Sequence, residues 1–171
     1  EGDVLDRLME MNIAPLSISY EFDPCDFLKA WEFQLKRDYP DYKKSTADDL
    51  KNMQTGLLGY KGRVHFHIAP CINASLATLD RKMPRQELFP KISALIVREI
   101  HRGYRLYPCN YVAADLLADT DVYASRYTAN DKSKFVAYLE GQLDRITLEN
   151  KDGVFLRRKM LEMYANPLKN Y

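Results

Sequence analysis

The sequence has no apolar run that approaches the ~18 residues expected of a membrane-spanning helix. It contains only three cysteines, Cys25, Cys71 and Cys109, which are far apart and odd in number. A disulfide framework and a Cys-x-x-Cys zinc site are therefore not expected, and the protein is predicted to be cytoplasmic. The chain also has almost no net charge, with 25 Lys and Arg against 24 Asp and Glu. This balance gives no electrostatic reason to expect a nucleic-acid partner.

What the sequence does contain is typical of a globular protein. Of its 171 residues, 46% are hydrophobic and 29% are charged, which suits one domain with a core of useful size. Twelve tyrosines are an unusual number, and we expect most of them to be structural. No internal repeat or domain boundary is evident. We therefore treat 1–171 as a single segment, with strands and crossover helices in 1–72 and a helical cap in 73–171.

Two segments have the composition of strands, Ile13–Tyr20 and Arg63–Ile72. Ile13–Tyr20 has no charged residue, and an uncharged strand is usually covered on both faces, as in a parallel sheet. In Arg63–Ile72 apolar and polar residues alternate, which predicts a strand with one covered face. The long connection between the two segments contains helical patterns, as a parallel β-α-β crossover requires.

Most of the remaining sequence has apolar residues at helical spacing, with capping residues and helix breakers at the ends. Ser45 precedes a run with acids in its first turn, which favours a helix start there. The fold class is therefore α/β, with few strands (about 13–20 and 63–72) and mostly helices. The predicted helices are Asp3–Met11, Phe27–Arg37, a helix from Ser45 to Gly56 or Gly59, Gln86–Arg102, Pro108–Ala118, Asn130–Ile146 and Val154–Ala165.

A sheet of only two strands with a long connection is not expected to be stable alone. We therefore expect the strands to pair with segments outside this chain, which would make the chain part of a longer protein. Glu1 in place of an initiator Met agrees with that expectation, although processing would give the same start. An unpaired strand edge also favours self-association.

His65 and His67 are two residues apart on a predicted strand, so their side chains share one face. Two imidazoles on one face can hold a metal ion, but the sequence offers no third ligand near them. We favour a polar, exposed strand face, and we predict no metal site and no cofactor.

Cys25 stands just before a predicted helix, where a thiol can have a lowered pKa and act as a nucleophile. A nucleophile needs a general base, and none is identifiable from the spacing. Asp23 or Asp26 is expected to cap this helix. Cys71 and Cys109 are expected to be small buried residues. The basic run 157–159 lies on an amphipathic helix, which suits a bilayer surface or, as we favour, an ordinary packed helix.

Two stretches of the sequence are similar to blocks of a known family. Ile13–Ile18 (Ile-Ala-Pro-Leu-Ser-Ile) resembles the fourth conserved block of the glycerolipid acyltransferases, in which a hydrophobic strand carries a proline. Gly62–Ile72 resembles the next strand of that family, with its Gly-basic-Val start and its Pro-x-Ile end. Further stretches at 19–26, 55–63, 107–110 and 164–170 resemble a Bacteroides-type member, so the similarity spans nearly all of the chain.

The catalytic block of that family is a His, four residues and an Asp, in which the His is the general base and the Asp orients it. In this sequence the fifth residue after a histidine is Pro70, Ile72 or Leu106. The family's Glu-Gly-x-Arg block, whose Arg is thought to hold the acceptor phosphate, is also absent. Both blocks precede the fourth block in family members, so their absence agrees with a C-terminal segment and predicts no catalytic residue here.

The resemblance implies that the chain is the C-terminal segment of an acyltransferase domain. The intact protein would transfer an acyl group from acyl-CoA or acyl carrier protein to glycerol 3-phosphate or lysophosphatidate, with peripheral contact at the inner membrane. The residues implied to line the substrate pocket are Ile13, Ala14, Pro15 and Leu16. A second hypothesis stays open: a self-contained, mostly helical binding or regulatory domain without catalysis, whose two strands form a minor ribbon.

Overall fold

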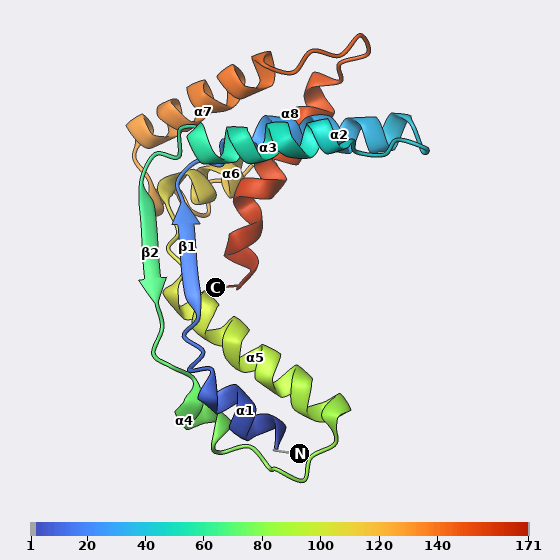
Figure 1. The fold of residues 1–171 in the computed structure, drawn as a ribbon. Helices are drawn as coiled ribbons and strands as arrows, with labels where there is room; N and C mark the ends of the chain where they lie inside the picture. Colours follow the sequence, from blue (N-terminus) through green and yellow to red (C-terminus); the bar gives the residue numbers. More distant parts are fainter. Residues whose placement is uncertain (1–2, 171) are drawn as a thin grey trace. The chain divides into compact units, whose positions relative to one another are not determined.

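The computed structural model describes residues 3–170 of the chain. Figure 1 shows that most of them are helical and that two strands run side by side. The elements, in chain order, are α1 (Val4–Glu10), β1 (Leu16–Tyr20), α2 (Asp26–Asp38), α3 (Thr46–Leu58), β2 (Val64–Ile68), α4 (Asn73–Leu76), α5 (Arg85–Gly103), α6 (Pro108–Ala118), α7 (Ala129–Asp144) and α8 (Gly153–Ala165), with 3-10 turns at Ala124–Arg126 and Asn166–Asn170.

The predicted helices are confirmed, with small shifts at their ends. The start of α3 shows why the prediction works: Ser45 and Asp48 form a capping box in which each side chain binds the other residue's backbone N–H. Pro108 occupies the first turn of α6, where its missing N–H costs nothing. The four-residue helix α4 was not predicted, because so short a segment shows no periodicity.

The chain divides into two compact units, and each unit combines an early and a late stretch of sequence. Unit 1 is formed by 1–19 and 64–105, and unit 2 by 20–63 and 106–171. The division of the sequence into strand region 1–72 and helical cap 73–171 stays a prediction. No helix within residues 3–170 is long and apolar enough to cross a membrane.

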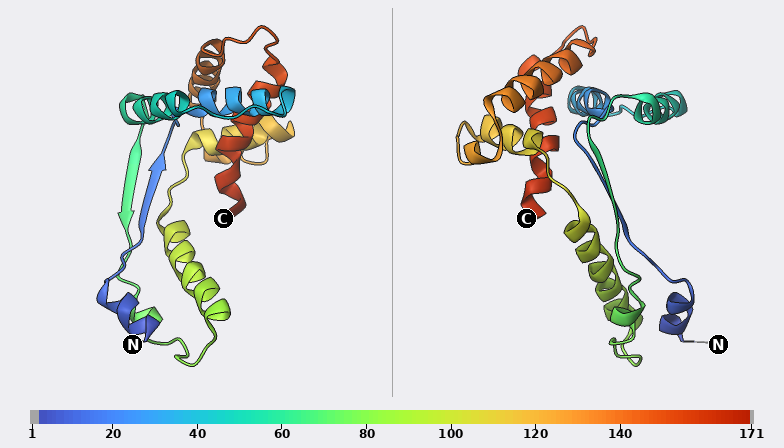
Figure 2. Two further views of the ribbon diagram at one scale, coloured as in Figure 1. Left: turned by 45° about the vertical axis from the view of Figure 1, so that its right-hand side comes forward. Right: turned by 90° about the vertical axis from the view of Figure 1, so that its left-hand side faces the viewer.

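Unit 2 is a helical bundle in which α8 packs on α2, α6 and α7. Its core is apolar and dense: Phe135, Leu139, Leu156 and Met160 are at most 1% exposed. Helix α3 differs from the other helices of this unit, because none of its residues is buried. In the right-hand view of Figure 2, α2 lies between α3 and α8.

Unit 1 contains the strand pair and the helices α1, α4 and α5. A small apolar cluster joins the three helices, and it is built from Leu5, Ile72, Leu76, Leu88 and Ile92. In the same unit, the C-terminal end of α5 contacts the strands. Unit 1 therefore has a smaller core than unit 2.

The two strands are antiparallel, as the opposed arrows of Figure 1 show, so the predicted parallel crossover is wrong. The segment that connects β1 to β2 leaves and rejoins the ribbon at the same end. The Glu21 N–H donates to the Arg63 carbonyl at 2.9 Å, and the Phe22 N–H donates to the Lys61 carbonyl at 3.0 Å. The reason is that the connection holds two helices, α2 and α3, so the chain leaves along one and returns along the other.

Candidate functional site

The most distinctive feature of unit 1 is the ribbon formed by β1 and β2. Its register is fixed near one end by the Ala69 N–H, which donates to the Pro15 carbonyl at 2.8 Å. The Ile72 N–H donates to the Ile13 carbonyl at 3.0 Å. The two stretches that resemble acyltransferase blocks are therefore hydrogen-bonded to each other.

The covered face of the ribbon is the polar one. Ser17 and Ser19 are 2% and 0% exposed. The Ser17 hydroxyl donates to the Ile100 carbonyl at 2.6 Å, and the Arg105 N–H donates to the Ser19 hydroxyl oxygen at 2.8 Å. Ser17 therefore satisfies a carbonyl in the last turn of α5, where an ending helix leaves carbonyls without partners, and Ser19 binds the backbone just after α5.

His65 and His67 share this covered side of the ribbon and are partly buried. Helix α5 comes so close that a Cβ atom built on Gly103 would lie 2.1 Å from the His67 Cδ2 atom. The prediction of a polar, exposed strand face is therefore wrong, because α5 packs against it. Within residues 3–170 no cluster of three His, Cys, Asp or Glu side chains could hold a metal ion.

The opposite face of the ribbon is apolar and open to solvent. The prediction that β1 is covered on both faces is therefore wrong, since its serines are covered and its leucine and isoleucine are not. A normal sheet surface has the reverse arrangement, with apolar side chains inside. The side chains of this apolar face, with their exposed fractions, are Leu16 (47%), Ile18 (38%), Val64 (41%), Phe66 (63%) and Ile68 (71%).

Both edges of the ribbon are also unpaired among residues 3–170, because the sheet there has two strands. The register directs the N–H and C=O groups of Ser17 and Ser19 toward β2. The corresponding groups of Leu16 and Ile18 point away from it. The same alternation holds along β2. The ribbon therefore presents an apolar face and two rows of backbone groups that a neighbouring strand could bind.

The structure places the four predicted pocket residues at the start of β1. Pro15 is buried and Ala14 is exposed, whereas Ile13 packs on the apolar cluster of unit 1. Leu16 belongs to the apolar face of the ribbon. The four cavities described for unit 2 do not include them, and their role in a substrate pocket stays a prediction.

A buried carboxylate lies inside unit 2. Asp26 is 0% exposed, and its Oδ2 atom accepts hydrogen bonds from the hydroxyls of Tyr164 at 2.7 Å and Tyr138 at 3.0 Å. Its Oδ1 atom accepts one from the Gln142 side-chain amide at 2.6 Å. Burial raises the pKa of Asp26 above its ordinary value, and these hydrogen bonds oppose the rise only in part.

The predicted capping role of Asp26 is wrong, because Cys25 is the N-cap of α2 and Asp26 is already helical. Its side chain turns inward to bind the two tyrosines. The abundance of tyrosine was the only signal of this cluster in the sequence, and the structural role predicted for tyrosine is confirmed for Tyr138 and Tyr164. Each carboxylate oxygen is already bonded within the bundle, so the cluster serves packing.

Neither Cys25 nor Cys109 shows an activated thiol. Burial is the main cause that raises the pKa of Cys25, whose Sγ atom donates to the Asn52 carbonyl at 3.3 Å. Burial likewise raises the pKa of Cys109 to about 12. A raised pKa disfavours the thiolate, which supports the structural interpretation of both residues. Cys71 is exposed, so the prediction that it is buried is wrong.

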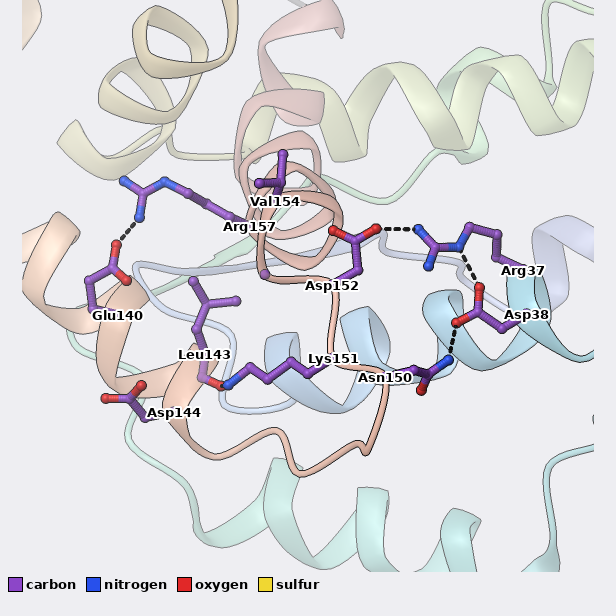
Figure 3. A pocket seen from close by; sticks show the side chains of 11 residues that line it. Arg37, Asp38, Glu140, Leu143, Asp144, Asn150, Lys151, Asp152, Val154 and Arg157 are labelled. Carbon is purple, nitrogen blue, oxygen red and sulfur yellow. Dashed lines mark hydrogen bonds and ion pairs between the residues drawn. The ribbon is translucent and has the colours of Figure 1, made fainter.

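Unit 2 has a groove of about 880 Å³ between the ends of α2 and α7 and the start of α8 (Figure 3). Two of its cations, Arg37 and Arg157, are paired with carboxylates, and Lys151 binds a backbone carbonyl. Dashed lines in Figure 3 join Arg37 to Asp152 and Asp38, at 2.8 Å and 2.6 Å, and Arg157 to Glu140. The Lys151 ammonium donates to the Leu143 carbonyl at 2.7 Å.

A second cavity of unit 2 has a volume of about 430 Å³ and is lined by both aromatic and charged side chains. At its rim the Arg63 guanidinium donates to Glu21 at 2.8 Å and 3.0 Å. Burial opposes ionisation of Glu21, but the hydrogen bonds from Arg63 outweigh it and lower the pKa of that carboxyl. This cavity is lined by no histidine, and its thiol, Cys109, has a raised pKa, so it contains no activated nucleophile.

No protein-family model, curated protein or solved structure matches the chain. Its class is therefore defined by its own fold, which is a mostly helical chain with a two-stranded antiparallel ribbon.

Proposed function

We propose that the chain is the C-terminal segment of a glycerolipid acyltransferase. The intact enzyme transfers an acyl group from acyl-CoA or acyl carrier protein to glycerol 3-phosphate or lysophosphatidate. In this proposal β1 and β2 are two strands of a larger sheet, unit 2 is a helical cap, and Ile13–Leu16 line the substrate pocket. The catalytic His and Asp are supplied by another part of the protein.

The observation that carries the proposal is the inverted ribbon. Its serines are buried and its apolar side chains are exposed, and both edges lack partners within residues 3–170. Strands inside a larger sheet are paired on both edges, and their apolar face is covered, so the open edges and the exposed apolar face support the proposal. The pairing of stretches 13–18 and 62–72 adds support, because both carry the resemblance to the acyltransferases.

The test is the reading frame upstream of the codon for Glu1. We expect a His-x-x-x-x-Asp motif within ~150 residues, about one domain's length. The polypeptide from the complete frame should transfer acyl groups to lysophosphatidate, and its His→Ala variant should not. The chain described here should show no turnover, because its three histidines lack the paired Asp. Turnover by this chain, or a frame without the motif, would refute the proposal.

The second candidate is a self-contained helical binding or regulatory domain. It is favoured by the bundle of unit 2, whose core of Phe135, Leu139, Leu156 and Met160 is complete without the ribbon. The same reading frame separates the two candidates. A frame that encodes no further strands, together with a soluble monomer at high concentration, would favour this second function.

A further inference from the structure

We infer that a third cavity of unit 2 binds a small aromatic carboxylate, with the ring among apolar side chains and the carboxylate at Arg145. The cavity lies between α2, α3 and the segment that follows α7, and its volume is about 150 Å³. The inference goes beyond the proposed acyl transfer and does not depend on it, because it rests on unit 2 and the proposal rests on the ribbon of unit 1.

The apolar part of the lining comes mainly from α2. Phe27 and Leu28 are 6% and 7% exposed, and Trp31 is partly buried. Ile146, which follows α7, adds a further apolar side chain that is 3% exposed. An engineered apolar cavity of about 150 Å³ binds benzene. The cavity therefore has room for one ring, and the rings of Phe27 and Trp31 favour an aromatic one.

The charged part of the lining is positive overall. Three cations, Lys44, Lys51 and Arg145, line the cavity together with two carboxylates, Glu32 and Asp48. The lining therefore has one positive charge in excess. A ligand with a single carboxylate neutralises this excess, whereas a cationic ligand would increase it.

Two ion pairs join the lining to residues outside it, and they leave the excess unchanged. Glu32 pairs with Lys36 at 2.7 Å, and Lys44 pairs with Asp49 at 2.7 Å. One pair adds a cation and the other adds a carboxylate. The region around the cavity is therefore as positive as the lining itself.

Arg145 is the cation best prepared to bind a carboxylate. Its guanidinium carbon lies 3.7 Å from the centroid of the Phe27 ring, and its Nη1 atom donates to the Gln142 side-chain oxygen at 2.8 Å. Within residues 3–170 it forms no ion pair with a carboxylate of the chain. The ring and the amide hold the guanidinium in one orientation, and its remaining N–H groups can bind both oxygens of a ligand carboxylate.

The experiment is a titration of the chain with benzoate, followed by tryptophan fluorescence and by isothermal titration calorimetry. Trp31 is the only tryptophan of the sequence and lines the cavity, so its emission reports binding at this site. We expect saturable binding with a dissociation constant of about 1 mM or below. Benzyl alcohol keeps the ring without the charge, and acetate keeps the charge without the ring. Each should bind at least ~10-fold more weakly than benzoate.

Three variants test the contacts. Arg145→Gln should weaken benzoate binding by about 10-fold or more, because it removes charge-assisted hydrogen bonds. Lys51→Gln should weaken it by at most about 5-fold, since an exposed lysine contributes less. Arg126→Gln is the matched control, because Arg126 also lies over a ring, that of Tyr111 at 5.8 Å, but is outside the lining. It should bind benzoate as wild type does.

Three results would overturn the inference. One is the absence of saturable benzoate binding by the wild-type chain at several times the expected dissociation constant. Another is equal affinity of Arg145→Gln and wild type, when both have the same circular dichroism spectrum. The third is equal affinity for benzyl alcohol and benzoate, which would decide the question even if Arg145→Gln did not fold. Benzoate binding by a protein without acyl transfer would leave the inference standing and remove only the proposed function.

Discussion

The bundle of unit 2 buries its apolar side chains, whereas the β1–β2 ribbon of unit 1 exposes them. In the bundle, Phe135 and Leu139 are at most 1% exposed and face other apolar groups. In the ribbon, Phe66 is 63% exposed and Ser19 is 0% exposed. The bundle therefore buries its apolar side chains within itself, whereas the ribbon exposes an apolar face that another structure is expected to cover.

The difference concerns burial and not strand or helix propensity. Residues of β1 and β2 are good strand formers, and their register is well defined by hydrogen bonds. What they lack within the described residues is a partner for one face and for both edges. A stable ribbon of this composition is explained if its serine face is anchored to α5 and its apolar face is an interface.

The largest expected effect is a pair of phenylalanine truncations, one in each region. Phe135→Ala should destabilise unit 2 by about 3–5 kcal/mol, because it leaves a cavity in a packed core. Phe66→Ala should change the free energy of unfolding by less than about 0.5 kcal/mol, since its ring is mostly in water. Urea unfolding followed by circular dichroism measures both. Equal losses would remove the distinction between the regions.

A smaller loss of stability is expected for a substitution where α5 packs against the serine face of the ribbon. Gly103→Ala should destabilise unit 1 by about 1–3 kcal/mol, because the new methyl would overlap the His67 ring and the Ser17 hydroxyl. Gly141→Ala in α7 is the control: nothing lies within 4 Å of its Cβ position, and alanine favours the helix by up to ~1 kcal/mol. A harmless Gly103→Ala would show that α5 does not cover this face closely.

The two regions differ in how much of their structure could be predicted from the sequence. The Ser45–Asp48 capping box and Pro108 signal helix starts locally, so the helices could be predicted. The strand direction could not, because it depends on where a long connection returns. The outward orientation of Phe66 could not be predicted either, since alternation alone does not say which face of a strand is covered. The Asp26 cluster joins residues far apart in sequence.

The buried carboxylate predicts a pH dependence confined to the bundle. The pKa of Asp26 is raised in the folded state above its ordinary 3.8, so its contribution to stability is fullest below pH 3.8. That contribution declines as the pH rises through the folded-state pKa, by about 1.4 kcal/mol for each unit of the rise. The free energy of unfolding of wild type minus that of Asp26→Asn should therefore decrease with pH. A constant or increasing difference would contradict this assignment.

The smallest expected effect on folding lies on α3. Leu57→Gln should change the stability of unit 2 by less than about 0.5 kcal/mol, although leucine is replaced by an amide, because the side chain is 79% exposed. Thermal unfolding measures the change, and Leu139→Gln in the core is the contrasting variant. A loss above ~1 kcal/mol for Leu57→Gln would mean that Leu57 is packed within the chain.

The central claim is that the open face and edges of the ribbon are covered by strands that residues 3–170 do not supply. Hydrogen exchange of individual backbone amides tests it most directly, in this chain and in the product of the complete reading frame. The outward amides of Leu16, Ile18 and Phe66 should exchange rapidly in the chain and become protected in the longer product, while those of Ser17 and Ser19 are protected in both. Rapid exchange of the outward amides in the longer product would contradict the claim.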